Sequence, residues 1–232
     1  MIQAILFDFN GVVIDDEPLH MKAYQEVLRG EDITLTEQDY LDSLGMDDVA
    51  FVRAAFARAG KMLEVDTLNG LIEQEGTLHR ELLGDELPLF PGVVTFIKAA
   101  ARRFTLGVVS MARREQIDYV LERAGLAKSF SVIVSAEDVT ACKPDPACYR
   151  RAFELLNQLP HHAGQFVLKP YEVLVIEDSP PGIKSARAVG LQTLGVTNTV
   201  AEAALRAAGA AIVTPNLSDW SPDAVELVFP RR

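Results

Sequence analysis

Cysteine is scarce in this sequence of 232 residues. Its two cysteines, Cys142 and Cys148, are too few for a disulfide framework, and their spacing with no histidine nearby is not a zinc pattern. We therefore expect two reduced thiols. The chain also lacks a signal for secretion or membrane insertion, because its apolar N-terminus has no basic leader and is interrupted by Asp8 and Asn10. These absences predict a cytoplasmic protein with no membrane partner.

Basic residues are scarce in one segment. The whole chain has 33 Asp and Glu against 22 Lys and Arg, a net charge of −11. Between Asp15 and Pro88 there are 18 acidic and 6 basic residues, so all of the excess negative charge lies there, and the rest of the chain is nearly balanced. A solvated helical surface explains most of these charges. Such a surface would repel nucleic acid and anionic membranes, so no polyanionic partner is expected.

Helix and strand patterns alternate from Pro91 onward, which predicts an α/β fold with a Rossmann-like, doubly wound parallel sheet. A hydrophobic content of 49% is enough for one full-sized core and a smaller second domain. A first strand is expected within 2–9. The other strands are expected at 104–109, 131–134, 172–176, 191–195 and 210–213, and helices at 92–103, 113–124, 145–156, 181–189, 200–208 and 222–228. The long connection at 157–171 is interpreted as a surface insertion rather than an interface.

Residues 15–90 carry helix patterns and no strand signal. Pro18 suits the first turn of one helix, Thr36 and Asp47 are candidate N-caps of two more, and a fourth is expected at 67–83. The helix after Thr36 is expected to include Leu44. Helices alone between a first strand and the next βα unit indicate an inserted all-helical cap. We predict a core of residues 1–14 and 91–232 and a cap of residues 15–90, with hinges near 14–17 and 87–92.

Four short motifs stand at the ends of predicted strands. The apolar run ILF ends on Asp8 and is followed by the turn residues Asn10 and Gly11. Open α/β sheets bind ligands in the crevice at this edge, although an isolated Asp-x-Asn-Gly would more simply close a strand. The other motifs follow in order along the chain: Ser110 after FTLGVV, Lys143 in ACKPDPACY, and Glu177 with Asp178 in EVLVIEDSPPGI.

Together the four motifs resemble those of the haloacid dehalogenase-like hydrolases, in the branch with a helical cap that includes β-phosphoglucomutase and many small-molecule phosphatases. The resemblance covers nearly the whole chain. It implies a Mg²⁺-dependent phosphatase of small phosphorylated metabolites, in which Asp8 attacks phosphorus and forms an aspartyl-phosphate. A catalytically silent phospho-ligand-binding protein and a sugar-phosphate mutase are the alternatives. The oligomeric state is not specified by the sequence, and a monomer or weak homo-oligomer is expected.

The resemblance also implies roles for individual residues. Mg²⁺ would be held by Asp8, the backbone carbonyl of Asn10, and Asp178, with Glu177 as a direct or an outer partner. Lys143 would balance the charge of Asp8 and of the transferred phosphate. Dehalogenase chemistry fits poorly, because the paired carboxylates indicate a metal that dehalogenases lack.

Further residues are candidates for binding the substrate. Ser110 and the backbone N–H of Met111 would bind a phosphoryl oxygen, and Ser110 is also a candidate N-cap for the helix that begins near 113. The loop at 44–48 offers acids where the sugar-phosphate mutase has a basic residue, which favours a phosphatase with a cationic or neutral polar leaving group. The remaining candidates are Gly11, Ala112, Gly45, Met46, Asp47, Asp48 and His20. For His20 alone, a packing role on the first cap helix is favoured over a role in binding.

One position departs from the family pattern. Phosphatases of the family have a second Asp two residues after the nucleophile, which protonates the leaving oxygen, and here that position is Asn10. An amide cannot shuttle a proton, and that help is worth about 10²- to 10⁴-fold in rate. We expect a slow phosphatase restricted to good leaving groups. The alternatives are a proton relay through His20, Asp15 or Asp16, and ligand binding without turnover.

Overall fold

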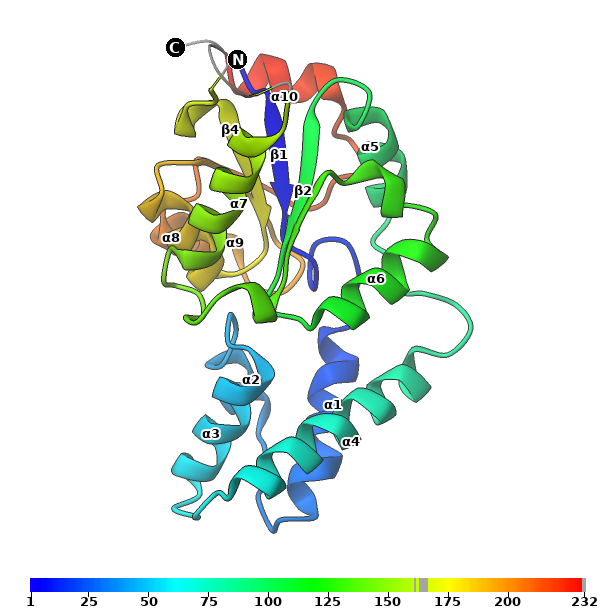
Figure 1. Ribbon diagram of the computed structural model, residues 1–232, viewed down its shortest axis with the longest axis vertical. Coiled ribbons are helices and arrows are strands. Elements are labelled where there is room, and N and C mark those ends of the chain that lie inside the picture. Colours follow the sequence, from blue (N-terminus) through cyan, green and yellow to red (C-terminus); the bar gives the residue numbers. More distant parts are fainter. Residues whose placement is uncertain (161, 163–166, 231–232) are drawn as a thin grey trace.

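A six-stranded parallel sheet organises the structure, a computed structural model that describes residues 1–160, 162 and 167–230 (Figure 1). The strands stand in the order β3-β2-β1-β4-β5-β6, so the chain builds outward from β1 on one side and then returns to build on the other. The predicted doubly wound α/β fold is confirmed. The strands are β1 Ala4–Phe7, β2 Thr105–Val109, β3 Val132–Val134, β4 Val173–Glu177, β5 Gln192–Val196 and β6 Ile212–Thr214.

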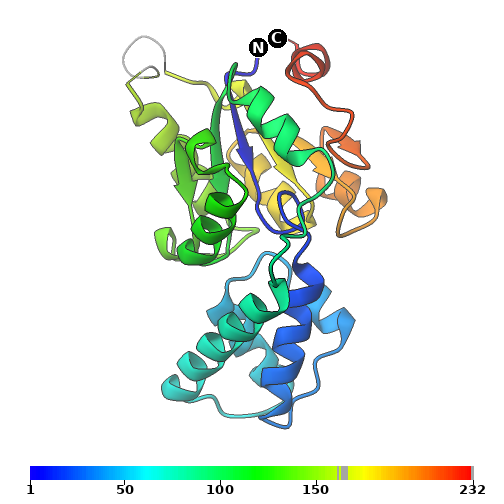
Figure 2. The ribbon, with the colours of Figure 1, turned by 90° about the vertical axis from the view of Figure 1, so that its right-hand side faces the viewer.

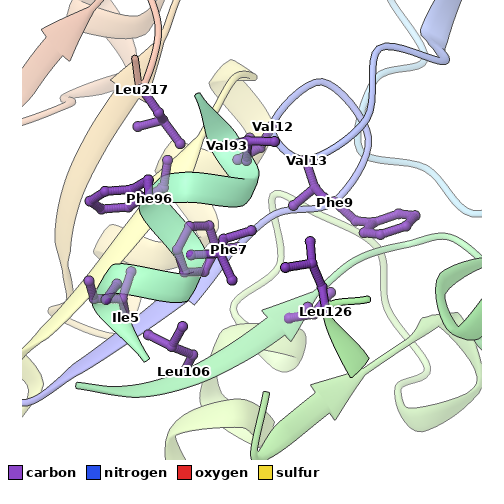
Figure 3. Close-up of a cluster of buried hydrophobic side chains, with 14 of the residues drawn as sticks. Ile5, Phe7, Phe9, Val12, Val13, Val93, Phe96, Leu106, Leu126 and Leu217 are labelled. Atoms are coloured by element: carbon purple, nitrogen blue, oxygen red, sulfur yellow. The ribbon is translucent and has the colours of Figure 1, made fainter. Parts of the chain in front are cut away.

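Helices cover both faces of the sheet, which explains why its central strand is apolar throughout. Ile5 and Phe7 point into one core and Leu6 into the other, because successive side chains of a strand alternate. In the first core Phe7 packs edge-on against Phe96 of α5 (Figure 3). The helices around the sheet are α5 Val93–Ala100, α6 Arg114–Arg123, α7 Ala147–Gln158, α8 Pro180–Ala188, α9 Glu202–Ala208 and α10 Pro222–Val228.

Four further helices form a separate layer next to the edge where β1 ends (Figures 1 and 2). They are α1 Glu17–Arg29, α2 Glu37–Leu41, α3 Asp48–Arg58 and α4 Val65–Leu83. This layer has an apolar cluster of its own, which includes Leu28, Phe56 and Leu71. The chain enters and leaves it side by side, where Asp15 N–H donates to the carbonyl of Pro88 at 2.7 Å. The division into a core and a cap at residues 14/15 and 90/91 stays a prediction.

The ends of the helices test the capping expectations. Thr36 and Asp47 are the N-caps of α2 and α3, and their side chains accept backbone N–H groups of the first turn. Two expectations are wrong. Leu44 lies outside α2, which ends at Leu41, and Arg113 rather than Ser110 is the N-cap of α6. Ser110 stands three residues before that cap, so its hydroxyl accepts the N–H of Ala112 within the preceding turn instead.

The connection at 157–171 is shorter than predicted, because α7 continues through Gln158. Residues 161 and 163–166 of this connection lie outside the described residues, so its interpretation as a surface insertion stays a prediction. No helix in the described part of the chain has both the length and the apolar character that a membrane crossing requires.

Candidate active site

A cleft lies between the carboxyl edge of the sheet and the helical layer. The strand order sets β1 between β2 and β4, so the segments that follow these strands meet at one place, where doubly wound sheets bind ligands. Of the predicted site residues, Gly11 and Glu177 lie outside the cleft lining. The sheet side carries Asp8, Asn10, Ser110, Met111, Ala112, Lys143 and Asp178, and the helical side carries His20, Gly45, Met46, Asp47 and Asp48.

Lys143 joins two of the predicted carboxylates. Its Nζ lies 2.8 Å from Asp8 Oδ1 and 2.7 Å from Glu177 Oε1, and it also approaches the carbonyl of Val109 at 3.4 Å. Burial alone would lower the pKa of Lys143, but the charges of Asp8 and Glu177 raise it well above its usual range. Lys143 is therefore a fixed positive charge where β1 ends.

Glu177 is held by donors on both of its oxygens. Oε1 accepts from Lys143 and, at 3.0 Å, from the hydroxyl of Tyr149. Oε2 accepts the backbone N–H groups of Asp178 and Ser179, each at 3.0 Å, and the Ser179 hydroxyl at 2.9 Å. Burial opposes ionisation, but Lys143 keeps the pKa of Glu177 low. These bonds favour the outer of the two roles considered for Glu177, since no oxygen lacks a donor.

Asp8 and Asp178 concentrate negative charge beside Glu177. One oxygen of each of these three carboxylates lies within 4.8 Å of the others. Burial, followed by the charge of Glu177, raises the pKa of Asp8 to about 7 and that of Asp178 well above its usual value. Gly11 has φ of +73°, and a Cβ there would stand 1.9 Å from Asp178 Oδ2. Two buried carboxyls this close need protons or a cation, and hard oxygen ligands suit Mg²⁺.

Asn10 is fixed by polar neighbours. Its Nδ2 donates to Asp16 Oδ1 at 2.9 Å and lies 3.4 Å from His20 Nε2, and its Oδ1 accepts from the Ser110 hydroxyl at 3.3 Å. Burial would raise the pKa of Asp16, but His20 and His79 lower it well below its usual range. The amide of Asn10 is therefore anchored to a carboxylate that stays ionised.

To the predicted Asp48 the helical layer adds Glu17, Tyr24 and Tyr40, which no sequence motif marked. Tyr24 donates to Asp48 Oδ1 and Tyr40 donates to Glu17 Oε2, each at 2.5 Å, and all four residues line the cleft. Burial raises the pKa of both Glu17 and Asp48. Aromatic residues within helices usually predict core packing, so only the packing of the helices reveals this polar wall. Asp15, one of the relay candidates, is exposed and does not line the cleft.

Comparison with known proteins agrees with this arrangement. A family model described as haloacid dehalogenase-like hydrolase matches residues 2–190. The chain belongs to the haloacid dehalogenase-like hydrolases. The resemblance that rested on the four motifs is thereby confirmed. In this hydrolase Asp8, Ser110 and Asp178 directly follow the neighbouring strands β1, β2 and β4, whereas Lys143 lies in the segment between β3 and α7.

Relatives of the hydrolase match along most of its length. The phosphorylated carbohydrates phosphatase of Thermotoga maritima is 28% identical, over 92% of this chain and 95% of its own. Validoxylamine A 7′-phosphate phosphatase of Streptomyces hygroscopicus subsp. limoneus is 27% identical, over 86% of this chain and 87% of its own. The crystal structure of β-phosphoglucomutase from Clostridium difficile shares the fold, with a TM-score of 0.85 at 18% identity over 99% of this chain and 97% of that one.

The raised pKa values predict that Mg²⁺ binding to this hydrolase depends on pH. Below about pH 7, Asp8 in the metal-free site carries a proton that the cation must displace. We expect Mg²⁺ affinity, measured by titration calorimetry, to increase from about pH 5.5 to about pH 7.5, by up to about tenfold per pH unit for each proton displaced. Asp8→Asn should reduce this slope. An affinity that does not change with pH would contradict the assignment of these carboxyls.

Proposed function

We propose that this chain is a Mg²⁺-dependent phosphatase-like hydrolase of small phosphorylated metabolites that works through an aspartyl-phosphate on Asp8. The observation that carries the proposal is the setting of Asp8, which lies 2.8 Å from the Lys143 ammonium and within 4.8 Å of carboxylate oxygens of Glu177 and Asp178. The phosphatase names of the relatives from Thermotoga and Streptomyces support this reaction class.

Asp8 is the nucleophile in this proposal. One of its oxygens attacks phosphorus, the bond from phosphorus to the leaving oxygen breaks, and water later cleaves the aspartyl-phosphate. Lys143 offsets the negative charge that the phosphate brings to Asp8. The hydroxyl of Ser110, which is buried beside Asn10, and the backbone at Met111 bind the phosphoryl oxygens.

The carboxylates beside Asp8 would hold the metal. Asp8, Asp178 and the backbone carbonyl of Asn10 are the proposed ligands, and Glu177 positions Lys143 and the turn after β4 through its hydrogen bonds to them. Bound Mg²⁺ would neutralise charge on the phosphoryl group and orient it. The raised pKa values of Asp8 and Asp178 support a cation here, because each carboxyl is costly to ionise in a metal-free site.

Asn10 is the reason to propose slow turnover. Its amide cannot protonate the leaving oxygen, so substrates with good leaving groups should react best. Of the three relay candidates, Asp15 lies outside the cleft and Asp16 is held ionised, which leaves His20 as the only one of them with a proton to offer near Asn10. Burial would lower the pKa of His20, but bonds to Asp16 and Glu75 raise it.

Two alternative functions can be distinguished from this one by whether the chain turns over its ligand and whether it accepts a second phosphate. A silent phospho-ligand-binding protein is favoured by Asn10 alone, and it would bind without turnover. A sugar-phosphate mutase would need to accept a second phosphate in the helical side of the cleft. That side carries Asp47 and Asp48 where a phosphate would need a positive charge.

Replacing Asn10 by Asp should restore proton transfer. The new carboxyl would face Asp16 where an amide now donates at 2.9 Å, so one of the two acids must hold a proton. An acid kept protonated near neutral pH suits a general acid. We expect Asn10→Asp to hydrolyse alkyl phosphates at least about tenfold faster, as measured by phosphate release.

Matched variants identify the source of this gain. Asn10→Ala should show no increase, and Asp8→Asn in the Asn10→Asp background should abolish turnover, as should a chelator. Mass spectrometry should find a phosphoryl group on Asp8. Equal rates for the native chain and Asn10→Asp would contradict the acid–base position. Saturable binding without turnover in both would support the silent binder.

The helical side of the cleft favours a leaving group without a second anion. It presents the carboxyls of Glu17, Asp47 and Asp48, and Lys143 on the opposite side is the only Lys or Arg among the described residues that line the cleft. Arg113 lies nearby, but it is paired with Asp48 at 3.1 Å. Hydroxyl or ammonium groups on the leaving portion would find acceptors here, whereas a phosphate would meet like charge.

The acidic residues on the helical side of the cleft, Glu17, Asp47 and Asp48, predict an order among substrates. We expect kcat/KM to fall from an amino-sugar monophosphate to the matching neutral sugar monophosphate and then to the sugar bisphosphate, with about tenfold or more between the first and the last. Asp47→Asn is a matched test, because Asn can still cap α3 at the N–H of Ala50. That variant should reduce the ratio of kcat/KM between the amino-sugar monophosphate and the sugar bisphosphate. A bisphosphate as the best substrate would contradict the role proposed for these acidic residues.

A further inference from the structure

A second cluster of charged side chains lies next to the candidate active site, in the seam between α1 and α4. Asp16 and His20 are four residues apart where α1 begins, and Glu75 and His79 are four residues apart on α4. This spacing sets both members of each pair on one side of their helix. The two helices run side by side in both ribbon views (Figures 1 and 2), and contacts between His20 and Glu75 and between Asp16 and His79 show that the pairs face each other.

The ring nitrogens and carboxylates converge on a small volume. Asp16 Oδ2 lies 3.6 Å from His20 Nε2 and 3.4 Å from His79 Nε2, and one ligand atom from each of these three residues lies within 4.8 Å of the others. Glu75 Oε1 is 2.8 Å from His20 Nδ1. If His20 is neutral and donates Nδ1–H to Glu75, its Nε2 lone pair lies on the side of Asp16 and Asn10, where a metal could displace the present contacts.

Buried polar atoms in this seam lack hydrogen-bond partners. Asp16, Glu75 and His79 are 1%, 0% and 3% exposed, and neither His79 Nε2 nor Glu75 Oε2 has a hydrogen bond. Such atoms are uncommon in folded proteins, and a bound ion is one of the explanations for them. Balancing both ionised carboxylates by protonating the two histidines would put positive charge on two rings stacked 3.7 Å apart.

The geometry points to a transition-metal site of the Zn²⁺ class in this seam, with Asp16, His20 and His79 as ligands and Glu75 as the outer carboxylate that orients His20. Two imidazoles and one carboxylate match the ligand set of three-ligand zinc sites. Nitrogen ligands disfavour Mg²⁺, so the seam and the Asp8 site should select different metals. A divalent ion with neutral histidines would also balance the charges of Asp16 and Glu75.

Binding requires a small rearrangement. The two rings are within 12° of parallel, so their Nε2 lone pairs lie in separate, nearly parallel planes and do not meet at one point. The rings must turn apart to bind one ion. The bound metal would then link α1 to α4, and it would be coupled to the candidate active site through the bond from Asn10 to Asp16. This inference does not depend on the proposed phosphatase reaction.

The test is a titration of the chelator-stripped full chain with Co²⁺ and with Zn²⁺, in saturating Mg²⁺ that fills the oxygen site. We expect one equivalent of Co²⁺ with visible absorption bands, its displacement by Zn²⁺, and a higher unfolding temperature with metal. His79→Gln should weaken Co²⁺ binding by at least about tenfold, and Glu75→Gln by about 10- to 100-fold. If His79→Gln does not fold, the Co²⁺ affinity of Glu75→Gln decides whether the proposal stands.

Two control variants locate the binding. Asp178→Asn, which alters the oxygen site, should keep the Co²⁺ equivalent and its absorption bands. His161→Gln with His162→Gln, which removes the other histidines of the chain, should also keep them. The proposal is overturned if the native chain binds no Co²⁺ in saturating Mg²⁺, or if the His79 and Glu75 variants bind it as tightly as the native chain does.

Discussion

The buried ammonium of Lys143 holds together the acids at the carboxyl edge of the sheet. It lies between Asp8, which directly follows β1, and Glu177 on β4, within hydrogen-bond distance of both. Lys143 itself belongs to the segment between β3 and α7. Without this charge three carboxylates would crowd one buried corner, which is costly in a medium of low polarity. The position of the proposed nucleophile Asp8 and the turn after β4 both depend on these contacts of Lys143 and Glu177.

Most of the fold can be predicted from the sequence, because both faces of the sheet are buried. Strands such as VLVIE are then apolar runs that end on polar residues, and a parallel sheet brings those ends to one edge. The sequence therefore brings Asp8 and Asp178 together without any known distance, whereas Lys143, in the segment between β3 and α7, is placed with them only by the motif resemblance. The prediction that Ser110 is the N-cap of α6 is wrong, because the number of turn residues between β2 and α6 follows from local geometry that no motif encodes.

The polar wall and the seam could not be predicted in the same way. Tyr24, Glu75 and His79 lie on helices, where aromatic and charged residues predict either core or solvent-exposed surface. Their roles depend on how α1 and α4 pack, since Glu75 meets His20 across 55 residues of chain. The i,i+4 spacing of acid and histidine on each helix was the one signal present in the sequence, and it gains meaning only when the helices are placed face to face.

The seam also gives a physical reason for the departure at Asn10. Asp16 is buried and ionised, and it needs a donor on the side that faces the cleft. An amide at position 10 supplies that donor, whereas a carboxylate would place like charges in contact. The Asn10 amide is thus the contact between the acids at the end of β1 and β4 and the acid–histidine cluster of the seam.

The central claim is that a divalent cation held between the first and fourth strands lets Asp8 accept a phosphoryl group. A crystal structure of the chain grown with Mg²⁺ and a beryllium fluoride phosphate mimic tests it most directly. The account predicts an ion bound by Asp8, Asp178 and the carbonyl of Asn10, with the fluoride group on Asp8 and Lys143 still beside it. Well-ordered crystals with no ion between Asp8 and Asp178 would contradict it.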